Sequence, residues 1–172
     1  MPKAYVRRTA DVAELVISAP PLNLFDGQLA ADLESALDEV TALTRDMSAR
    51  AVLLRAEGQV FCAGVDVHEF QGLGPSQGAA LMARFLALVQ TLERVPVPTI
   101  AVVHALNLTI GFELCLGCDL MWAAEDATFG LVEATVGLTP GGGGTQRLVA
   151  RAVLGVTRKE ADHGQGAGVP GR

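Results

Sequence analysis

Aromatic side chains, cysteines and cationic side chains are all scarce in this sequence of 172 residues. Trp, Tyr and Phe make up 5% of the residues, whereas half of all residues are hydrophobic, so the core must be packed mainly with Ala, Val and Leu. Lys and Arg number 13 against 19 Asp and Glu, which gives a net charge of −6. Because a nucleic-acid-binding surface needs clustered Lys and Arg, we exclude a nucleic-acid partner.

The three cysteines are too few, and odd in number, for the disulfide framework of a small secreted protein. Cys115 and Cys118 match the spacing C-x-x-C, but no second pair of ligands lies near them to complete a zinc site. A redox pair is one interpretation, and we favour two small buried residues. The N-terminus has no hydrophobic signal core. We therefore expect a cytoplasmic protein with no metal site.

One uncharged stretch, Val95–Phe112, is long enough to raise the question of a membrane span. Pro96, Pro98 and His104 interrupt it and argue against that interpretation. Thr99–Val103 within the stretch is typical of a buried strand instead. We predict no membrane partner.

Strand and helix patterns alternate along the chain, which is long enough for one domain with a sizeable core. This alternation predicts an α/β protein with a largely parallel sheet. The last residues, 159–172, are rich in glycine and lack apolar periodicity, so we predict a core domain over 1–158 and an unpacked tail over 159–172. The predicted strands cover residues 5–8, 12–18, 51–55, 99–103 and 119–123, and the predicted helices cover 27–43 (capped by Asp26), 79–94, 111–116 and 143–154.

Two glutamates are notable because each is set in apolar and glycine-rich sequence. Glu113 follows the uncharged stretch, and Glu133 comes shortly before the run Gly141–Gly144. Burial removes solvation from a carboxylate and raises its pKa toward neutrality, which is what a general acid or base needs. Helix capping or ion pairing would explain either residue alone. For two such residues we favour a catalytic pair.

Three segments together resemble a known family. They are Phe61–Asp66 (FCAGVD), Pro98–Leu114, and Cys118–Leu148, which contains FGLVE and GLTPGGGGTQRL. In order, spacing and residue type they closely resemble the enoyl-CoA hydratase/isomerase (crotonase) superfamily, over roughly residues 3–158. The resemblance implies a crotonase (ClpP-like) fold, in which repeated ββα units form a spiral, and an acyl-CoA thioester as ligand.

The resemblance also implies roles for individual residues. The backbone amides of Val65 and Ile110 would form an oxyanion hole for the thioester enolate. Glu113 would act as base while water attacks the β-carbon, and Glu133 would deliver a proton to the α-carbon. Hydratases of the family carry both glutamates, whereas its isomerases usually keep only the one that matches Glu133.

Further matches concern binding of the substrate. Ala63 and Gly64 match the loop that meets CoA, and the Gly141 amide matches a position that helps to hold the water. Asp66 is expected either at the mouth of the pocket or as the cap of the following helix, and we favour the cap.

The sequence departs from the family pattern in two places. Thr109-Ile110-Gly111 stands where the family commonly has three glycines, so the side chain of Ile110 could narrow the acyl pocket or shift its amide. Family members also usually continue beyond this length into helices that complete the pocket and build a trimer. We therefore expect a fold whose C-terminal helices are truncated, with apolar surface left to be covered by association.

The resemblance favours an enoyl-CoA hydratase that adds water to a trans-2-enoyl-CoA. A Δ3-Δ2 enoyl-CoA isomerase and a non-catalytic acyl-CoA-binding subunit are the alternatives. No metal, flavin or nicotinamide cofactor is implied, because CoA enters as part of the substrate. A homo-oligomer, either a trimer or a hexamer, is the expected assembly.

Overall fold

The computed structural model describes residues 1–152. The domain boundary predicted at residue 158 and the tail predicted over 159–172 lie outside these residues. The helix predicted over 143–154 begins at residue 144 and is helical through residue 152, the last residue described.

Every predicted strand and helix is present within the described residues, and the observed bounds differ from the predicted ones by a few residues. The strands are β1 (Ala4–Thr9), β2 (Val12–Ile17), β3 (Ala51–Ala56), β4 (Thr99–Val103), β5 (Leu106–Leu108), β6 (Leu120–Ala123) and β7 (Thr128–Gly130). The helices are α1 (Gly27–Arg45), α2 (Pro75–Glu93) and α3 (Ile110–Gly117), with short 3-10 turns η1 (Val67–Phe70) and η2 (Glu133–Val136). The sequence patterns did not predict β5, β7 or η2, whereas η1 is the short helix expected after Asp66.

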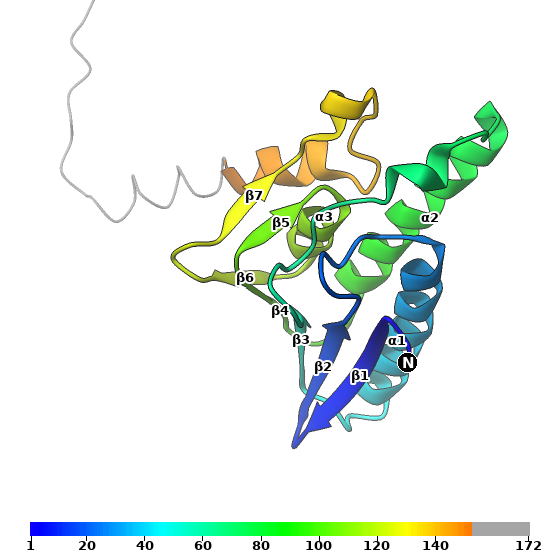
Figure 1. The fold of residues 1–172 in the computed structure, drawn as a ribbon. Helices are drawn as coiled ribbons and strands as arrows, with labels where there is room; N and C mark the ends of the chain where they lie inside the picture. The colour runs from blue at the N-terminus through cyan, green and yellow to red at the C-terminus, as the bar shows by residue number, and fades with distance from the viewer. Residues whose placement is uncertain (153–172) are drawn as a thin grey trace, which may run out of the picture.

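The elements repeat as ββα units, as expected. β1, β2 and α1 form the first unit, β4, β5 and α3 form another, and β6, β7 and the helix from residue 144 follow (Figure 1). One sheet has the order β1-β2-β3-β4-β6, and β5 and β7 form a second, smaller sheet. Between these units, the segment after β3 forms no full strand and makes two isolated bridges, from Cys62 to Asn107 and from Val65 to Phe25. All neighbours in the larger sheet are parallel except β1 and β2.

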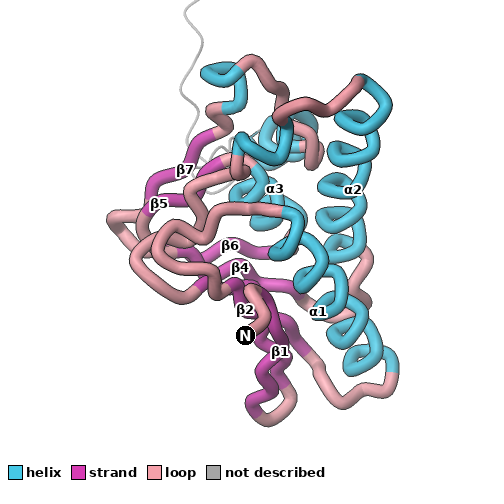
Figure 2. The backbone as a smooth tube through the Cα atoms, turned by 45° about the vertical axis from the view of Figure 1, so that its right-hand side comes forward, coloured by secondary structure: helices cyan, strands magenta, loops and turns pink. Residues whose placement is uncertain are grey.

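Helix α1 packs against β1 and β2 of the larger sheet, and α2 packs against α1 and α3 (Figure 2). Alternate strand residues, such as Val52 and Leu54 in β3, are fully buried in the core. Asp26 caps α1 as predicted, because its carboxylate accepts a hydrogen bond of 2.8 Å from the Leu29 amide. Phe25, just before the cap, packs edge-on against Phe85 of α2 at a centroid distance of 5.2 Å.

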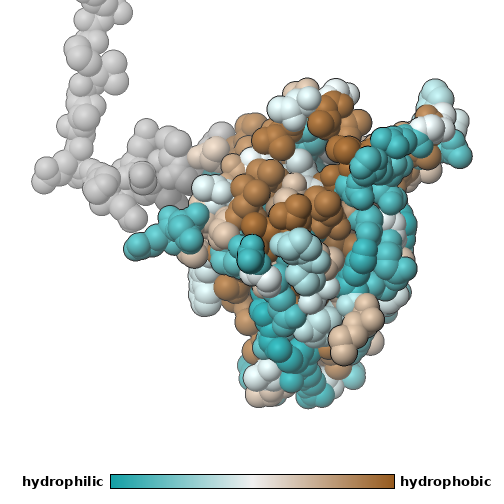
Figure 3. Space-filling model, viewed as in Figure 1, coloured by the Kyte–Doolittle hydropathy of each residue, from teal (hydrophilic) through white to brown (hydrophobic). Residues whose placement is uncertain are grey.

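The other face of the larger sheet is open. The register places Leu53, Ile100 and Leu120 side by side across the last three strands, and Val102 is paired with Trp122. Trp122 is 61% exposed and Leu120 is 50% exposed. Figure 3 shows that hydrophobic side chains also gather on the face seen in Figure 1, above the hydrophilic β1–β2 end. Apolar surface is therefore left uncovered, as expected.

Within residues 1–152, no helix combines the length and the apolar character that crossing a membrane requires. The uncharged stretch forms β4, β5 and the start of α3 instead.

Candidate active site

Helix α3 holds Glu113 in the interior. Each residue of this short helix is buried, and it begins directly after β5. Gly111 allows α3 to pack this closely, because a Cβ at this position would lie 2.4 Å from the Cβ of Cys62 and 2.5 Å from the Asn107 Oδ1. The close contact ties the first turn of α3 to the loop that follows β3. Glu113 lies in this first turn, where the helix dipole favours a negative charge.

The carboxylate of Glu113 is held by the glycine run. Its Oε2 accepts a hydrogen bond of 3.0 Å from the Gly142 amide, and its Oε1 accepts one of 2.8 Å from the Gly144 amide. Burial raises the pKa of Glu113, whereas the two amides, and then the positive charge of Arg147, oppose that rise. The glycine run is thus a binding loop for the ionised form of Glu113.

Arg147 holds this glycine loop in place. Its Nη1 donates a hydrogen bond of 2.8 Å to the Gly142 carbonyl oxygen, and its Nη2 donates one of 2.7 Å to Glu93 of α2. At Gly142, a Cβ would lie 2.8 Å from the Glu113 Oε2, so any larger residue would push against the carboxylate. Arg147 therefore affects Glu113 indirectly, because it fixes the position of the glycine loop that binds the carboxylate.

Glu133 lies in a different environment. It begins the turn η2 and is 7% exposed, and neither of its carboxylate oxygens has a hydrogen-bond partner within the described part of the chain. Burial raises its pKa, its own backbone amide partly offsets that rise, and the negative charge of Glu113 adds to it. Such a group is available to a ligand or to water.

Glu133 borders a cavity of about 140 Å³. The loop Ala63–Val65 lines the same cavity, together with Thr109 and apolar side chains from the segment around η2. The structure therefore brings the predicted residues Ala63, Gly64, Val65 and Glu133 together. Glu113 does not line this cavity, and it is linked to Glu133 by the effect of its charge.

The two predicted oxyanion donors are free of hydrogen bonds to the described residues. Phe25 pairs with the residues on either side of Val65: its amide donates to the Gly64 carbonyl oxygen at 2.9 Å, and its carbonyl oxygen accepts from Asp66 at 3.1 Å. Alternate amides of an extended segment point in opposite directions, so the Val65 amide faces away from Phe25. Within residues 1–152, neither this amide nor that of Ile110 donates a hydrogen bond to the protein.

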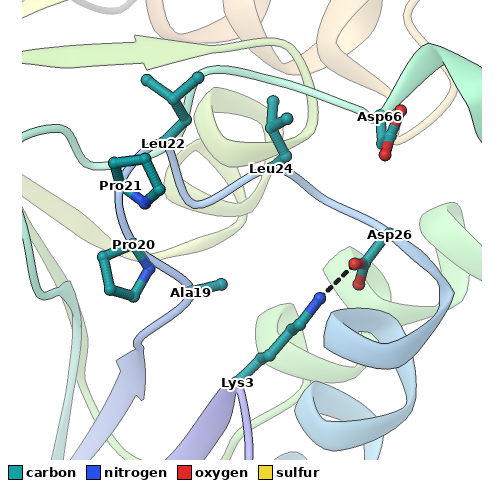
Figure 4. Close-up of a pocket in the computed structure, with 8 residues that line it drawn as sticks. All are labelled: Lys3, Ala19, Pro20, Pro21, Leu22, Leu24, Asp26 and Asp66. Atoms are coloured by element: carbon teal, nitrogen blue, oxygen red, sulfur yellow. Dashed lines mark hydrogen bonds and ion pairs between the residues drawn. The ribbon is translucent and has the colours of Figure 1, made fainter.

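Asp66 does not line the cavity that Glu133 borders. It caps the turn η1, as favoured, by accepting a hydrogen bond of 3.0 Å from the His68 amide. It also lines a second hollow, of about 260 Å³, with Lys3 and Leu22 (Figure 4). Lys3 points at Asp26 across this hollow and forms an ion pair with it. The loop Ala63–Asp66 thus borders one cavity with its first residues and the other with its last.

Gly141 is the predicted residue whose neighbourhood differs most from the expected one. A Cβ there would lie 2.5 Å from the Met82 Sδ, so Gly141 packs against α2. The amides bound to Glu113 are those of Gly142 and Gly144, which sequence reasoning did not single out. The length of the glycine run was the signal available, because consecutive glycines allow several amides to approach one carboxylate.

Cys115 and Cys118 are buried free thiols, as favoured. Burial raises the pKa of Cys118 to about 12 and that of Cys115 well above its usual value. Thiols with such pKa values are inert, and Cys115 instead accepts a hydrogen bond of 3.2 Å from the Asn107 side chain. The C-x-x-C pattern thus contributes to the core.

The chain is similar in sequence to several known proteins. Residues 7–159 match the family model described as enoyl-CoA hydratase/isomerase. A probable enoyl-CoA hydratase of Bacillus subtilis (strain 168) is 38% identical over 138 residues, which are 80% of this chain and 52% of that protein. The human mitochondrial methylglutaconyl-CoA hydratase is 41% identical over 110 residues, which are 63% of this chain and 32% of that protein.

A solved structure shows the same likeness. The crystal structure of an enoyl-CoA hydratase from Bacillus anthracis superposes with a TM-score of 0.78 at 31% identity, over 92% of this chain and 61% of that one. The chain thus spans about half, or less, of the length of the curated relatives described above.

Proposed function

Because the chain belongs to the enoyl-CoA hydratase/isomerase family and has the crotonase fold, we propose that it is an enoyl-CoA hydratase that adds water to a trans-2-enoyl-CoA thioester. The observation that carries the proposal is the contrast between two buried glutamates. Glu113 accepts two backbone amides, whereas Glu133 faces a cavity without a hydrogen-bond partner in the described residues.

The contrast between the two carboxylate environments supports a base at Glu113 and an acid at Glu133. Hydrogen bonds from amides favour a charged carboxylate, so Glu113 is the group that ionises first. Its charge then helps to keep the proton on Glu133, whose burial already disfavours ionisation. Two carboxyl groups of which one is held by amide donors and the other is not are suited to opposite roles in proton transfer. Glu113 is therefore the base and Glu133 the acid.

The reaction follows from these assignments. Glu113 takes a proton from water as the water oxygen bonds to the β-carbon of the substrate. The electrons of the double bond move toward the thioester carbonyl oxygen, where the Val65 and Ile110 amides are free to donate hydrogen bonds. As the enolate collapses, its α-carbon takes the proton of Glu133. No metal or redox cofactor is needed for these steps, and CoA is part of the substrate.

We expect kcat/KM for crotonyl-CoA to give a bell-shaped pH profile whose acid limb lies above the ordinary glutamate pKa of 4.5. Activity falls on the acid side because Glu113, with a raised pKa, takes up a proton and can no longer act as base. It falls on the alkaline side because Glu133 loses the proton it must deliver. Initial rates in constant-ionic-strength buffers test this, and an acid limb below 4.5 would contradict the assignment.

The reaction class is tested by mixing the protein with crotonyl-CoA and following loss of the conjugated-enoyl absorbance. Turnover that is lost in both Glu113→Gln and Glu133→Gln supports hydration. If Glu113→Gln instead keeps activity on a 3-enoyl-CoA, the chain is an isomerase. Binding of butyryl-CoA without any turnover of either substrate identifies an acyl-CoA-binding subunit.

Association of several copies is the second part of the proposal, and the open face of the larger sheet supports it. If Leu120 and Trp122 lie between copies, Trp122→Ser should shift the protein to a smaller assembly in size-exclusion chromatography with light scattering. Met47→Ser is the matched control, because Met47 is 66% exposed and follows α1, outside the strand that carries Leu120 and Trp122. Equal masses for the parent protein and both variants would contradict the role of Trp122.

A further inference from the structure

Thr109 has an unusual backbone conformation between β5 and α3. Its φ is 49° and its ψ is −122°, a region that β-branched residues rarely adopt. Hydrogen bonds hold it on both sides: its amide donates to the Gly130 carbonyl oxygen at 2.8 Å, and its own carbonyl oxygen accepts from Glu113 at 2.9 Å. Strain of this kind persists where the surrounding structure fixes the residue, and it concentrates at functional sites.

The hydroxyl group of Thr109 is buried and has no partner. The residue is 8% exposed, and its Oγ1 has no hydrogen-bond partner within residues 1–152. A buried hydroxyl without a partner loses its hydrogen bonds to water and gains none in return, which is costly. The cost disappears when a ligand with a free acceptor binds beside it.

The surroundings of the hydroxyl indicate which acceptor that is. Thr109 lines the same cavity as Val65 and Glu133, and it directly precedes Ile110. A Cβ on Gly64 would lie 2.9 Å from the Thr109 Oγ1, so the hydroxyl stands against the residue that precedes Val65. Thr109 therefore directly precedes one of the two donor residues in the chain and stands against the residue before the other. Its hydroxyl makes no bond to Glu133, whose oxygens are equally unpaired within the described residues.

We propose that the Thr109 hydroxyl donates a third hydrogen bond, beside those of Val65 and Ile110, to the thioester carbonyl oxygen of a bound acyl-CoA. This inference rests on the proposed acyl-CoA function. A hydroxyl group can turn its proton toward the acceptor, and a β-branched side chain restricts the position of its oxygen. The donor is thus oriented before the substrate arrives, and it acts on the oxygen that gains negative charge during the reaction.

The test uses butyryl-CoA labelled with 13C at the thioester carbonyl, which has no double bond to hydrate. Each hydrogen bond to the carbonyl oxygen lowers its stretching frequency, which isotope-edited infrared spectroscopy measures on the bound ligand. We expect a large downshift in the parent protein and in Thr109→Ser, which keeps the hydroxyl. Thr109→Val keeps the shape but lacks the donor, so its downshift should be smaller. Its kcat/KM for crotonyl-CoA should fall roughly 100-fold.

The outcomes separate this proposal from the proposed function. If the parent protein binds butyryl-CoA and Thr109→Val shows the same downshift and the same kcat/KM, the third donor is refuted and the acyl-CoA site stands. If the parent protein does not bind butyryl-CoA, both fail. Should Thr109→Val not fold, Thr109→Ala replaces it, because Ala105 already adopts a φ of 49° in this chain.

Discussion

Replacing Glu133 by Gln is expected to lower kcat for the hydration of crotonyl-CoA by about 1000-fold. The amide cannot deliver the proton that the α-carbon requires. The folded protein should be at least as stable as the parent, because neither oxygen of Glu133 has a hydrogen-bond partner to lose within residues 1–152. Initial rates and urea unfolding of the purified variant measure the two effects.

The difference in stability between Glu133→Gln and the parent protein should depend on pH. The pKa of Glu133 is raised in the folded state, so the folded protein holds this proton more tightly than the unfolded chain does. Ionising Glu133 therefore destabilises the fold as the pH rises from the unfolded value, near 4.5, through the folded value. Glu133→Gln should thus gain stability over the parent at neutral pH and show little difference at pH 4.

Glu113→Gln is the matched comparison. It should lose a similar amount of activity, but it should also lose stability. Both oxygens of Glu113 accept backbone amides, and the NH₂ group of Gln would face one of those amides as a second donor. Leaving one buried amide unpaired costs about 1–3 kcal/mol. If Glu133→Gln destabilises the protein as much as Glu113→Gln does, the structural contrast between the two glutamates is wrong.

Gly111→Ala is expected to lower the free energy of unfolding by about 3 kcal/mol, and with it to remove activity. Its Cβ would stand 2.4 Å from the Cys62 Cβ and 2.5 Å from the Asn107 Oδ1, both fully buried. The Cys62 Cβ is fixed to the backbone, and the buried Asn107 side chain is held by its hydrogen bond to Cys115, so α3 must move away from the loop after β3. That movement displaces the Ile110 amide at the start of the helix.

Gly78→Ala serves as the control for this change. Gly78 also lies in a helix, α2, and a Cβ there meets nothing within 4 Å. Ala is the better helix former at such a position, so this variant should gain about 0.5–1 kcal/mol. Urea midpoints of both variants test the pair. A Gly111→Ala protein as stable as the Gly78→Ala protein would mean that the contact between α3 and Cys62 is not as tight as described.

Local patterns predicted most of the secondary structure. The spacing of Leu29, Leu33 and Leu37 after Asp26 predicted α1, because helical periodicity and capping involve residues close together in the chain. The apolar run of Thr99–Val103 predicted β4 in the same way. β5 and β7 were missed because each has three residues, too few to show a period, and they exist through pairing between Leu106–Leu108 and Thr128–Gly130.

The same distinction between local pattern and long-range contact applies to the candidate catalytic residues. The sequence by itself determined that Glu113 and Glu133 would be buried carboxylates, because their apolar neighbours are adjacent in the chain. Only the tertiary structure decided that their environments are opposite, since the amides of Gly142 and Gly144 reach Glu113 from a distant segment. It also decided that the Thr109 hydroxyl stands against Gly64 without a hydrogen-bond partner among the described residues. Burial follows from local composition, whereas a hydrogen-bond partner depends on which remote backbone the fold brings within about 3 Å.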